Sequence, residues 1–170
     1  MISEGRVWKF GDDVNTDLII PGRYLSSYEP AHLARHAMEG ANKDFASKVS
    51  RGDIIVAGRN FGCGSSREQA VVALKHAGVG AVLARSFARI YYRNSINLGL
   101  PAYVSEDACT VLNDGIVATI DSRTGRISSK DGKKLGQFNP PPEHLRAIIE
   151  AGGLIPHLQT IMRPSPRDRP

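Results

Sequence analysis

The stretch DIIVAGRNFGCGSSREQAVVALKHA, residues 53–77, decides the fold of this chain. Its first part, residues 53–57, is an apolar run with the length and β-branched content of a buried strand. Its last part, residues 69–77, places apolar side chains at helical spacing. The segment between them, residues 58–68, is rich in glycine. The pattern therefore predicts a strand, a turn and a helix, in that order.

The turn has the composition of an anion-binding loop. Gly62 and Gly64 permit positive φ angles and the close approach of a ligand. Ser65 and Glu68 match the capping box S-x-x-E at the start of the helix. Unpaired N–H groups and the positive end of the helix dipole gather at such a start, and Arg67 adds a bidentate donor. We expect a carboxylate or a phosphate to bind here.

Three well-known loops do not match this turn. A Walker A loop needs Gly-Lys-Ser/Thr, and a dinucleotide loop G-x-G-x-x-G needs glycine at the position of Arg67. A hydrolase elbow G-x-S-x-G is also absent, because Ser65 lies between Gly64 and Ser66. Two interpretations of Ser65 remain open, an N-cap and a reactive hydroxyl.

The remainder of the chain predicts an α/β fold with a mostly parallel central sheet. A second buried strand at 80–84 is followed by a helix that opens at 85–89, and such alternation implies right-handed crossovers with ligands at the carboxyl ends of the strands. Further patterns predict a strand at 6–10, a helix at 30–38, a hairpin at 116–120 and 126–129, and helices within 143–158. We expect one domain, residues 1–162, and a loose tail, residues 163–170.

Composition narrows the class of protein. The net charge is +5, but the basic residues are scattered rather than gathered in a stripe, which argues against nucleic acid as a partner. No apolar run approaches the roughly 18 residues of a membrane span, and we expect a cytoplasmic protein. The two cysteines, Cys63 and Cys109, form neither a disulfide framework nor a zinc motif, so free thiols are expected.

Three separated motifs carry a resemblance to a known family. They are GDDVNTD at 11–17, NFGCGSSRE at 60–68 and SFARI at 86–90. Together they resemble the small subunit of 3-isopropylmalate dehydratase, the detached counterpart of the aconitase swivelling domain. The resemblance covers about residues 5–103 and implies an aconitase-like swivelling domain with β/β/α layers.

The resemblance also implies a reaction and the residues that serve it. The family dehydrates and rehydrates hydroxy acids, here 2-isopropylmalate to 3-isopropylmalate in leucine biosynthesis. By resemblance Ser65 is the base that removes a proton from carbon, and Ser66 and Arg67 contact a substrate carboxylate. The residues expected to shape the site are Asp12, Asp13, Thr16, Gly62 and Gly64.

The family uses a four-iron four-sulfur cluster as its Lewis acid. Ligation on the aconitase pattern needs at least three cysteines, and this chain has two, one of them in the turn. No metal site is therefore expected in this chain. The resemblance implies that a large partner subunit holds the cluster and that this chain is inactive alone.

Substrate choice depends on the residues after Tyr24-Leu25, which in this family contact the variable group of the substrate. Ser26 and Ser27 offer no apolar wall and no arginine, and the missing arginine argues against a substrate with a third carboxylate. Arg23, which lies nearby, weakens this argument. Related hydro-lyases acting on homoaconitate, citramalate or dimethylmalate stay open, as does a non-catalytic anion-binding module. His32 and His36, four residues apart, are interpreted as surface histidines rather than metal ligands.

Overall fold

The computed structural model describes residues 1–162, and a mixed sheet of order β4-β3-β2-β1-β5-β6-β7 forms its centre. The strands are β1 (Ile2–Lys9), β2 (Ile54–Ala57), β3 (Ala81–Ala84), β4 (Ala102–Val104), β5 (Val117–Asp121), β6 (Arg126–Ser129) and β7 (Lys134–Gln137). Strands β1 to β4 pair in parallel, whereas β5, β6 and β7 continue the sheet with antiparallel pairings. The predicted α/β class is confirmed, and its parallel part is the β1–β4 half.

The two halves of the sheet meet on β1. Residues 2–6 pair with β5, and residues 7–9 pair with β2, so one strand serves both halves. This is why β1 is longer than the predicted strand at 6–10. Buried Asp53 fixes the junction between β1 and β2: its carboxylate accepts hydrogen bonds from the Arg6 amide at 3.0 Å, the Trp8 indole at 2.9 Å and the Ser50 amide at 2.9 Å.

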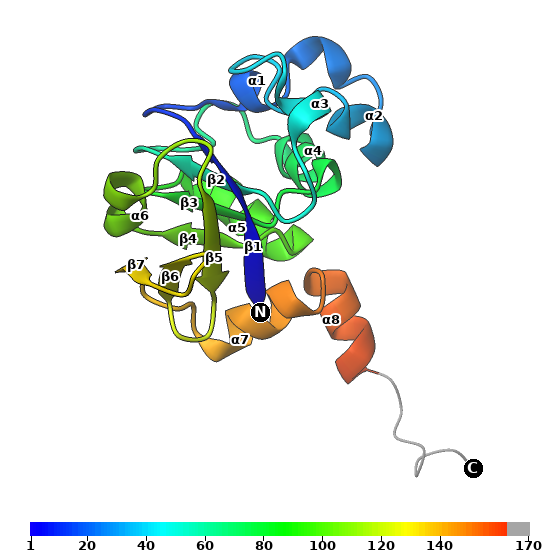
Figure 1. Ribbon diagram of the computed structural model, residues 1–170. Coiled ribbons are helices and arrows are strands. Elements are labelled where there is room, and N and C mark those ends of the chain that lie inside the picture. Colours follow the sequence, from blue (N-terminus) through cyan, green and yellow to red (C-terminus); the bar gives the residue numbers. More distant parts are fainter. Residues whose placement is uncertain (163–170) are drawn as a thin grey trace, which may run out of the picture.

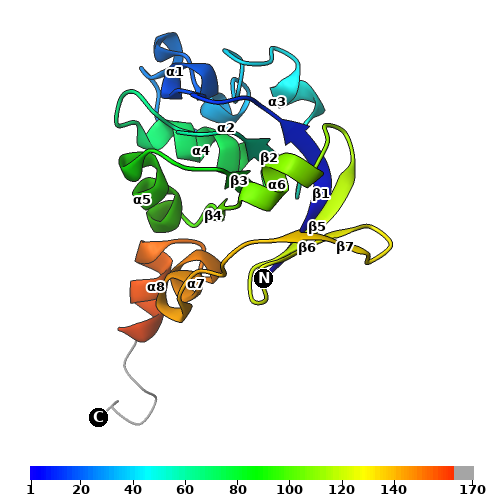
Figure 2. The ribbon, with the colours of Figure 1, turned by 90° about the vertical axis from the view of Figure 1, so that its left-hand side faces the viewer.

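Helices cover both faces of the parallel half. They are α1 (Thr16–Ile19), α2 (Pro30–Ala34), α3 (Phe45–Lys48), α4 (Glu68–Ala77), α5 (Arg89–Leu98), α6 (Glu106–Val111), α7 (Glu143–Glu150) and α8 (Leu154–Ile161), with a 3₁₀ turn η1 (Gly22–Tyr24). Helices α1 to α5 lie on one side of the parallel strands and α6 on the other, while α7 and α8 lie below (Figures 1 and 2). None of the described helices is long and apolar enough to cross a membrane.

The core consists of two apolar clusters separated by the sheet. In β2, Ile55 and Ala57 belong to the cluster that includes α4, and Ile54 and Val56 belong to the cluster that includes α6 and the β5–β6 hairpin. A strand that is buried on both faces reads as a continuous apolar run, which is the pattern that the sequence showed. The sheet is therefore a rigid support for the loops at its ends.

Several predicted elements are confirmed, and others differ in extent. The hairpin at 116–120 and 126–129 is the antiparallel pair β5 and β6, and the helices expected within 143–158 are α7 and α8. The helix predicted at 30–38 ends at Ala34, and Met38 takes a positive φ of 58°. Strands β4 and β7 were not predicted, because both are short and β7 lacks an apolar run. The tail predicted at 163–170 lies outside the described residues.

Candidate functional site

Three loops meet at the carboxyl ends of the first three parallel strands. They are residues 10–15 after β1, residues 58–67 after β2 and residues 85–88 after β3. The amide of Phe61 donates to the Ser86 carbonyl at 3.0 Å, and the amide of Gly62 donates to the Val14 carbonyl at 2.8 Å. The middle loop is thus held from both sides. The 58–68 segment and Ser86 thus lie together at the edge of the sheet where parallel sheets bind ligands.

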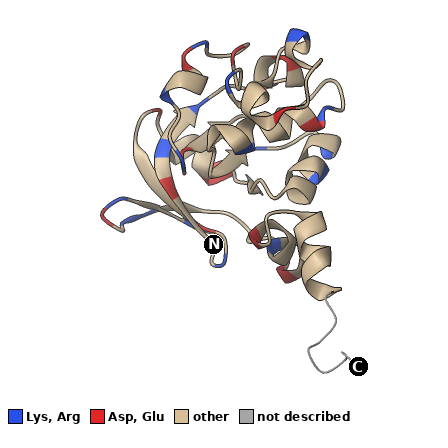
Figure 3. Cartoon of the chain, turned by 90° about the vertical axis from the view of Figure 1, so that its right-hand side faces the viewer, with Lys and Arg blue, Asp and Glu red and all other residues tan. Residues whose placement is uncertain are grey.

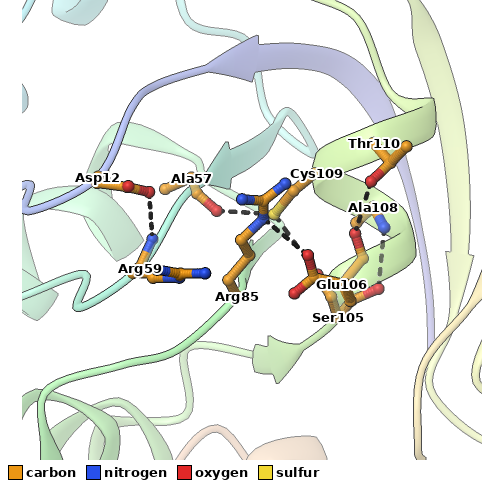
Figure 4. Close-up of polar contacts among 9 residues, drawn as sticks. All are labelled: Asp12, Ala57, Arg59, Arg85, Ser105, Glu106, Ala108, Cys109 and Thr110. Carbon is orange, nitrogen blue, oxygen red and sulfur yellow. Dashed lines mark hydrogen bonds and ion pairs between the residues drawn. The ribbon is translucent and has the colours of Figure 1, made fainter.

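The first loop is hydrogen-bonded to the start of the middle loop. The carboxylate of Asp12 accepts the Arg59 amide at 2.7 Å (Figure 4), and the carboxylate of Asp13 accepts the side-chain amide of Asn60 at 2.9 Å. The amide of Thr16 donates to the Cys63 carbonyl at 2.8 Å. Asp12, Asp13 and Thr16, which were expected to shape the site, therefore lie against the middle loop.

Gly62 and Gly64 have positive φ angles of 78° and 92°. Tyr91 of α5 fills the space that a side chain on Gly62 would need, because a Cβ there would lie 2.1 Å from Cγ of Tyr91. Tyr91 is buried against the rings of Phe61 and Phe87, at centroid distances of 5.2 and 6.2 Å. Gly62 thus brings the middle loop close to α5.

The predicted capping box is wrong. Helix α4 begins at Glu68, its N-cap is Arg67, and no side chain caps it. The carboxylate of Glu68 instead accepts the hydroxyl of Tyr28 at 3.0 Å, a contact across 40 residues. Ser65 is therefore not the N-cap of α4, and its role as a reactive hydroxyl stays a prediction.

Ser65 opens instead into a cavity of about 630 Å³ in front of α5. The residues that line this cavity are Asn60, Gly62, Gly64, Ser65, Ala88, Arg89, Ile90 and Arg93. Ala88 is the N-cap of α5, so the unpaired N–H groups of a ten-residue helix face the same space as the hydroxyl. Arg89 and Arg93, one turn apart, are exposed and form no ion pair within the described residues. The cavity at Ser65 is thus also bordered by the start of α5, which the sequence did not indicate.

Arg67 is engaged with another protein group. One guanidinium nitrogen donates to a carboxylate oxygen of Asp17 at 2.7 Å, and the second approaches the other oxygen at 3.4 Å. The Arg67 hydrogen bond is the main cause that lowers the pKa of Asp17, whose side chain is 61% exposed. A substrate carboxylate at Arg67 would have to share the guanidinium with Asp17. Ser66 is exposed beside it.

Ser26 and Ser27 follow η1 in a segment, residues 22–28, that borders the start of α4. A Cβ on Gly22 would lie 4.0 Å from a guanidinium nitrogen of Arg67, and the Tyr28 hydroxyl bonds Glu68. Ser26 is exposed, and the hydroxyl of Ser27 accepts the Glu29 amide at 3.2 Å. The structure thus brings the expected substrate segment beside the Ser65-Ser66-Arg67 turn.

The two histidines belong to an aromatic cluster rather than to the open surface. His36 stacks on Tyr24 with ring centroids 3.6 Å apart, and His32 packs at 5.2 Å from His36. The Nδ1 atom of His36 lies 2.8 Å from a carboxylate oxygen of Glu39. Within the described residues no group of three or more His, Cys, Asp or Glu side chains could hold a metal ion. The pairs Asp17–Arg67 and Glu39–Arg23 could not be read from the sequence, because their members lie 50 and 16 residues apart.

The cysteines do not provide a cluster site. Both are free, and the Cys109 thiol donates to the Ala57 carbonyl at 2.9 Å, under the ion pair of Arg85 and Glu106 (Figure 4). Burial raises the pKa of this thiol. A cluster needs several thiolates that converge on one point, and this donor set does not fit one.

Charged residues of both signs are spread over the fold rather than collected on one element (Figure 3).

Comparison with known proteins identifies the family of this chain. The aconitase C-terminal domain family matches residues 13–105, more than half of the chain, and the chain belongs to this family. The methanogen homoaconitase small subunit of Methanothermobacter thermautotrophicus is 56% identical, over 94% of this chain and 93% of the relative. The 3-isopropylmalate dehydratase small subunit of Nautilia profundicola is also 56% identical, over 89% and 90%.

A solved structure gives the same result for the fold. The crystal structure of 3-isopropylmalate dehydratase from Methanocaldococcus jannaschii superposes with a TM-score of 0.88 at 48% identity and covers 95% of each chain. The expected aconitase-like fold is confirmed by this match and by the family. The curated relatives have nearly the same length as this chain, so the similarity extends well beyond the three motifs.

Proposed function

We propose that this chain is the small subunit of a hydro-lyase that interconverts 2-isopropylmalate and 3-isopropylmalate by dehydration and rehydration, a step of leucine biosynthesis. The observation that carries the proposal is the cavity in which Ser65, Arg89, Arg93 and the first turn of α5 meet. Relatives that carry the name 3-isopropylmalate dehydratase small subunit, at about 50% identity over most of the chain, support it. We expect the protein to work in the cytoplasm.

In this proposal Ser65 is the base that takes a proton from the carbon next to a substrate carboxylate. A serine hydroxyl is a weak base in water, so its alkoxide needs preorganised positive charge. Arg89, Arg93 and the N–H groups that open α5 supply such charge on the same cavity wall. The same two guanidinium groups are suited to hold the carboxylate that makes the carbon acidic.

Ser66 and Arg67 would form the second carboxylate contact. Arg67 already binds Asp17, and this pair fixes the guanidinium in one orientation before a substrate arrives. A fixed fork donates two parallel hydrogen bonds to a carboxylate at a lower entropy cost than a free side chain. Asp17 would then be a positioning residue whose bond is shared or exchanged when the substrate binds.

The chemistry requires a partner subunit. Because the thiols of this chain do not fit a cluster, we place the four-iron four-sulfur cluster of the family in the large subunit. The open cavity is compatible with a site that closes only when the two subunits meet. No step of the proposal for this chain depends on nucleic acid or on a membrane.

A homoaconitase small subunit is the second candidate function, because a relative of that name is 56% identical. Such an enzyme must bind a third carboxylate. Ser26 and Ser27 themselves offer no cation for it, and isopropylmalate therefore remains the favoured substrate. Citramalate and dimethylmalate dehydratases stay less favoured alternatives.

Reconstitution with a cluster-loaded large subunit under anaerobic conditions tests the proposal. We expect no turnover by this chain alone, turnover of 2-isopropylmalate by the complex, and a loss of about 10²–10⁴-fold in kcat for Ser65→Ala. Ser47→Ala is the matched control, since its hydroxyl only bonds the Asp44 carbonyl in α3. Near-normal turnover by Ser65→Ala, or stoichiometric iron bound to this chain alone, would contradict the proposal.

A further inference from the structure

Asn60 in the middle loop is bonded to both neighbouring loops. Its side-chain amide donates to the carboxylate of Asp13, in the loop after β1, at 2.9 Å. Its backbone amide donates to the hydroxyl oxygen of Ser86, in the loop after β3, at 2.9 Å. Asn60 also lines the same cavity as Ser65. A single residue therefore joins all three loops at the wall of the candidate site.

The backbone is strained at both ends of the bond between Asn60 and Asp13. Among residues 1–162 only Asp13, Met38 and Asn60 combine a side chain with a positive φ, and the values at Asp13 and Asn60 are 54° and 59°. Asparagine and aspartate enter this left-handed region more readily than other residues with a side chain, although it stays uncommon for them. Strained backbone of this kind persists where surrounding contacts hold it, and it gathers at active sites.

The chain between Asn60 and Ser65 contains the two glycines of the turn. Gly62 and Gly64 both have positive φ angles, and glycine populates many backbone conformations at similar energy. The direction in which Ser65 leaves the turn therefore depends on contacts that hold the neighbouring residues. The amide of Thr16 contacts the carbonyl between the two glycines at 2.8 Å, and the bonds of Asn60 hold the start of the turn.

We propose that Asn60 is a positioning residue: through its bonds to Asp13 and Ser86 it holds the turn that carries Ser65 in the orientation required for proton transfer. Asp13 is exposed and does not line the cavity, so a change of its side chain reaches the site through Asn60. A misdirected hydroxyl slows the chemical step but leaves the groups that bind the substrate carboxylates in place. This inference rests on the proposed function, because it concerns the reaction of Ser65.

The first test uses the chain by itself and needs no substrate. Asp13→Gly removes the carboxylate and keeps a residue that adopts a positive φ without strain. We expect amide hydrogen exchange in peptides covering residues 58–65, measured by mass spectrometry, to become at least about threefold faster, with a melting temperature within about 4 °C. Asp13→Asn keeps an acceptor oxygen and is expected to restore slow exchange. Asn113→Gly, at an exposed residue between α6 and β5, is the matched control.

The second test measures turnover of 2-isopropylmalate in the reconstituted complex. Asp13→Gly is expected to lower kcat about tenfold with KM within about twofold, and Asp13→Asn to recover kcat to within about threefold of the wild type. Asn60→Gly combined with Asp13→Gly is expected to lose no more activity than Asn60→Gly alone, because the same bond is already absent.

The outcomes separate this inference from the proposed function. An unchanged kcat or unchanged exchange in Asp13→Gly, or an additive loss in the double variant, would overturn the positioning role while the wild-type complex still turns over isopropylmalate. A wild-type complex without that activity would overturn both.

Discussion

Replacing Gly62 by alanine perturbs the contact between the middle loop and α5. The added Cβ would lie 2.1 Å from Cγ and 2.5 Å from Cβ of Tyr91, and the φ of 78° is strained for any residue with a side chain. The left-handed conformation costs about 1–2 kcal/mol for an L-residue, and overpacking a core costs about 1–3 kcal/mol more. We therefore expect Gly62→Ala to lower the free energy of unfolding by about 2–5 kcal/mol.

The clash at Gly62 can be separated from the strain with a second glycine. Gly132 has a similar φ of 84°, but a Cβ there would meet nothing within 4 Å. Gly132→Ala is thus expected to cost only the conformational strain, about 1–2 kcal/mol. Urea unfolding of both variants, followed by circular dichroism, measures the difference. Equal stability of the two variants within about 0.5 kcal/mol would refute the argument that Tyr91 occupies the space at Gly62.

Three further predictions follow from the site and the sheet junction. Arg93→Gln in the reconstituted complex is expected to raise KM for 2-isopropylmalate about tenfold with little change in melting temperature; an unchanged KM would remove Arg93 from the proposed carboxylate contacts. Ser26→Arg is expected to shift kcat/KM toward tricarboxylates by about tenfold, which competition between the two acids would measure. Asp53→Ala leaves the Trp8 indole and two amides unpaired in the core, and urea unfolding is expected to show a loss of about 2–4 kcal/mol; a loss below about 1 kcal/mol would contradict this.

The sequence by itself determined the elements whose information is local. The runs 54–57 and 81–84 have the length and composition of buried strands, and the apolar residues after Glu68 have the spacing of a helix that covers them. Parallel strands with helical crossovers then place the loops after β1, β2 and β3 at one edge, so that the region of the site followed from the order of elements. The three motifs at 11–17, 60–68 and 86–90 indicated the family to which the chain belongs.

Only the tertiary structure decided which groups meet at that edge. Ser65 and Glu68 have the spacing of a capping box, yet the Glu68 carboxylate accepts the Tyr28 hydroxyl, and the cavity at Ser65 is bordered by the start of α5. Arg67 binds Asp17, which lies 50 residues earlier in the chain, and Arg23 binds Glu39. A hydrogen bond contributes about 1 kcal/mol wherever it forms. A local sequence pattern therefore shows which side chains are able to pair, but not which pair forms. The fold chooses the pairs, because it sets which competing partners come within reach.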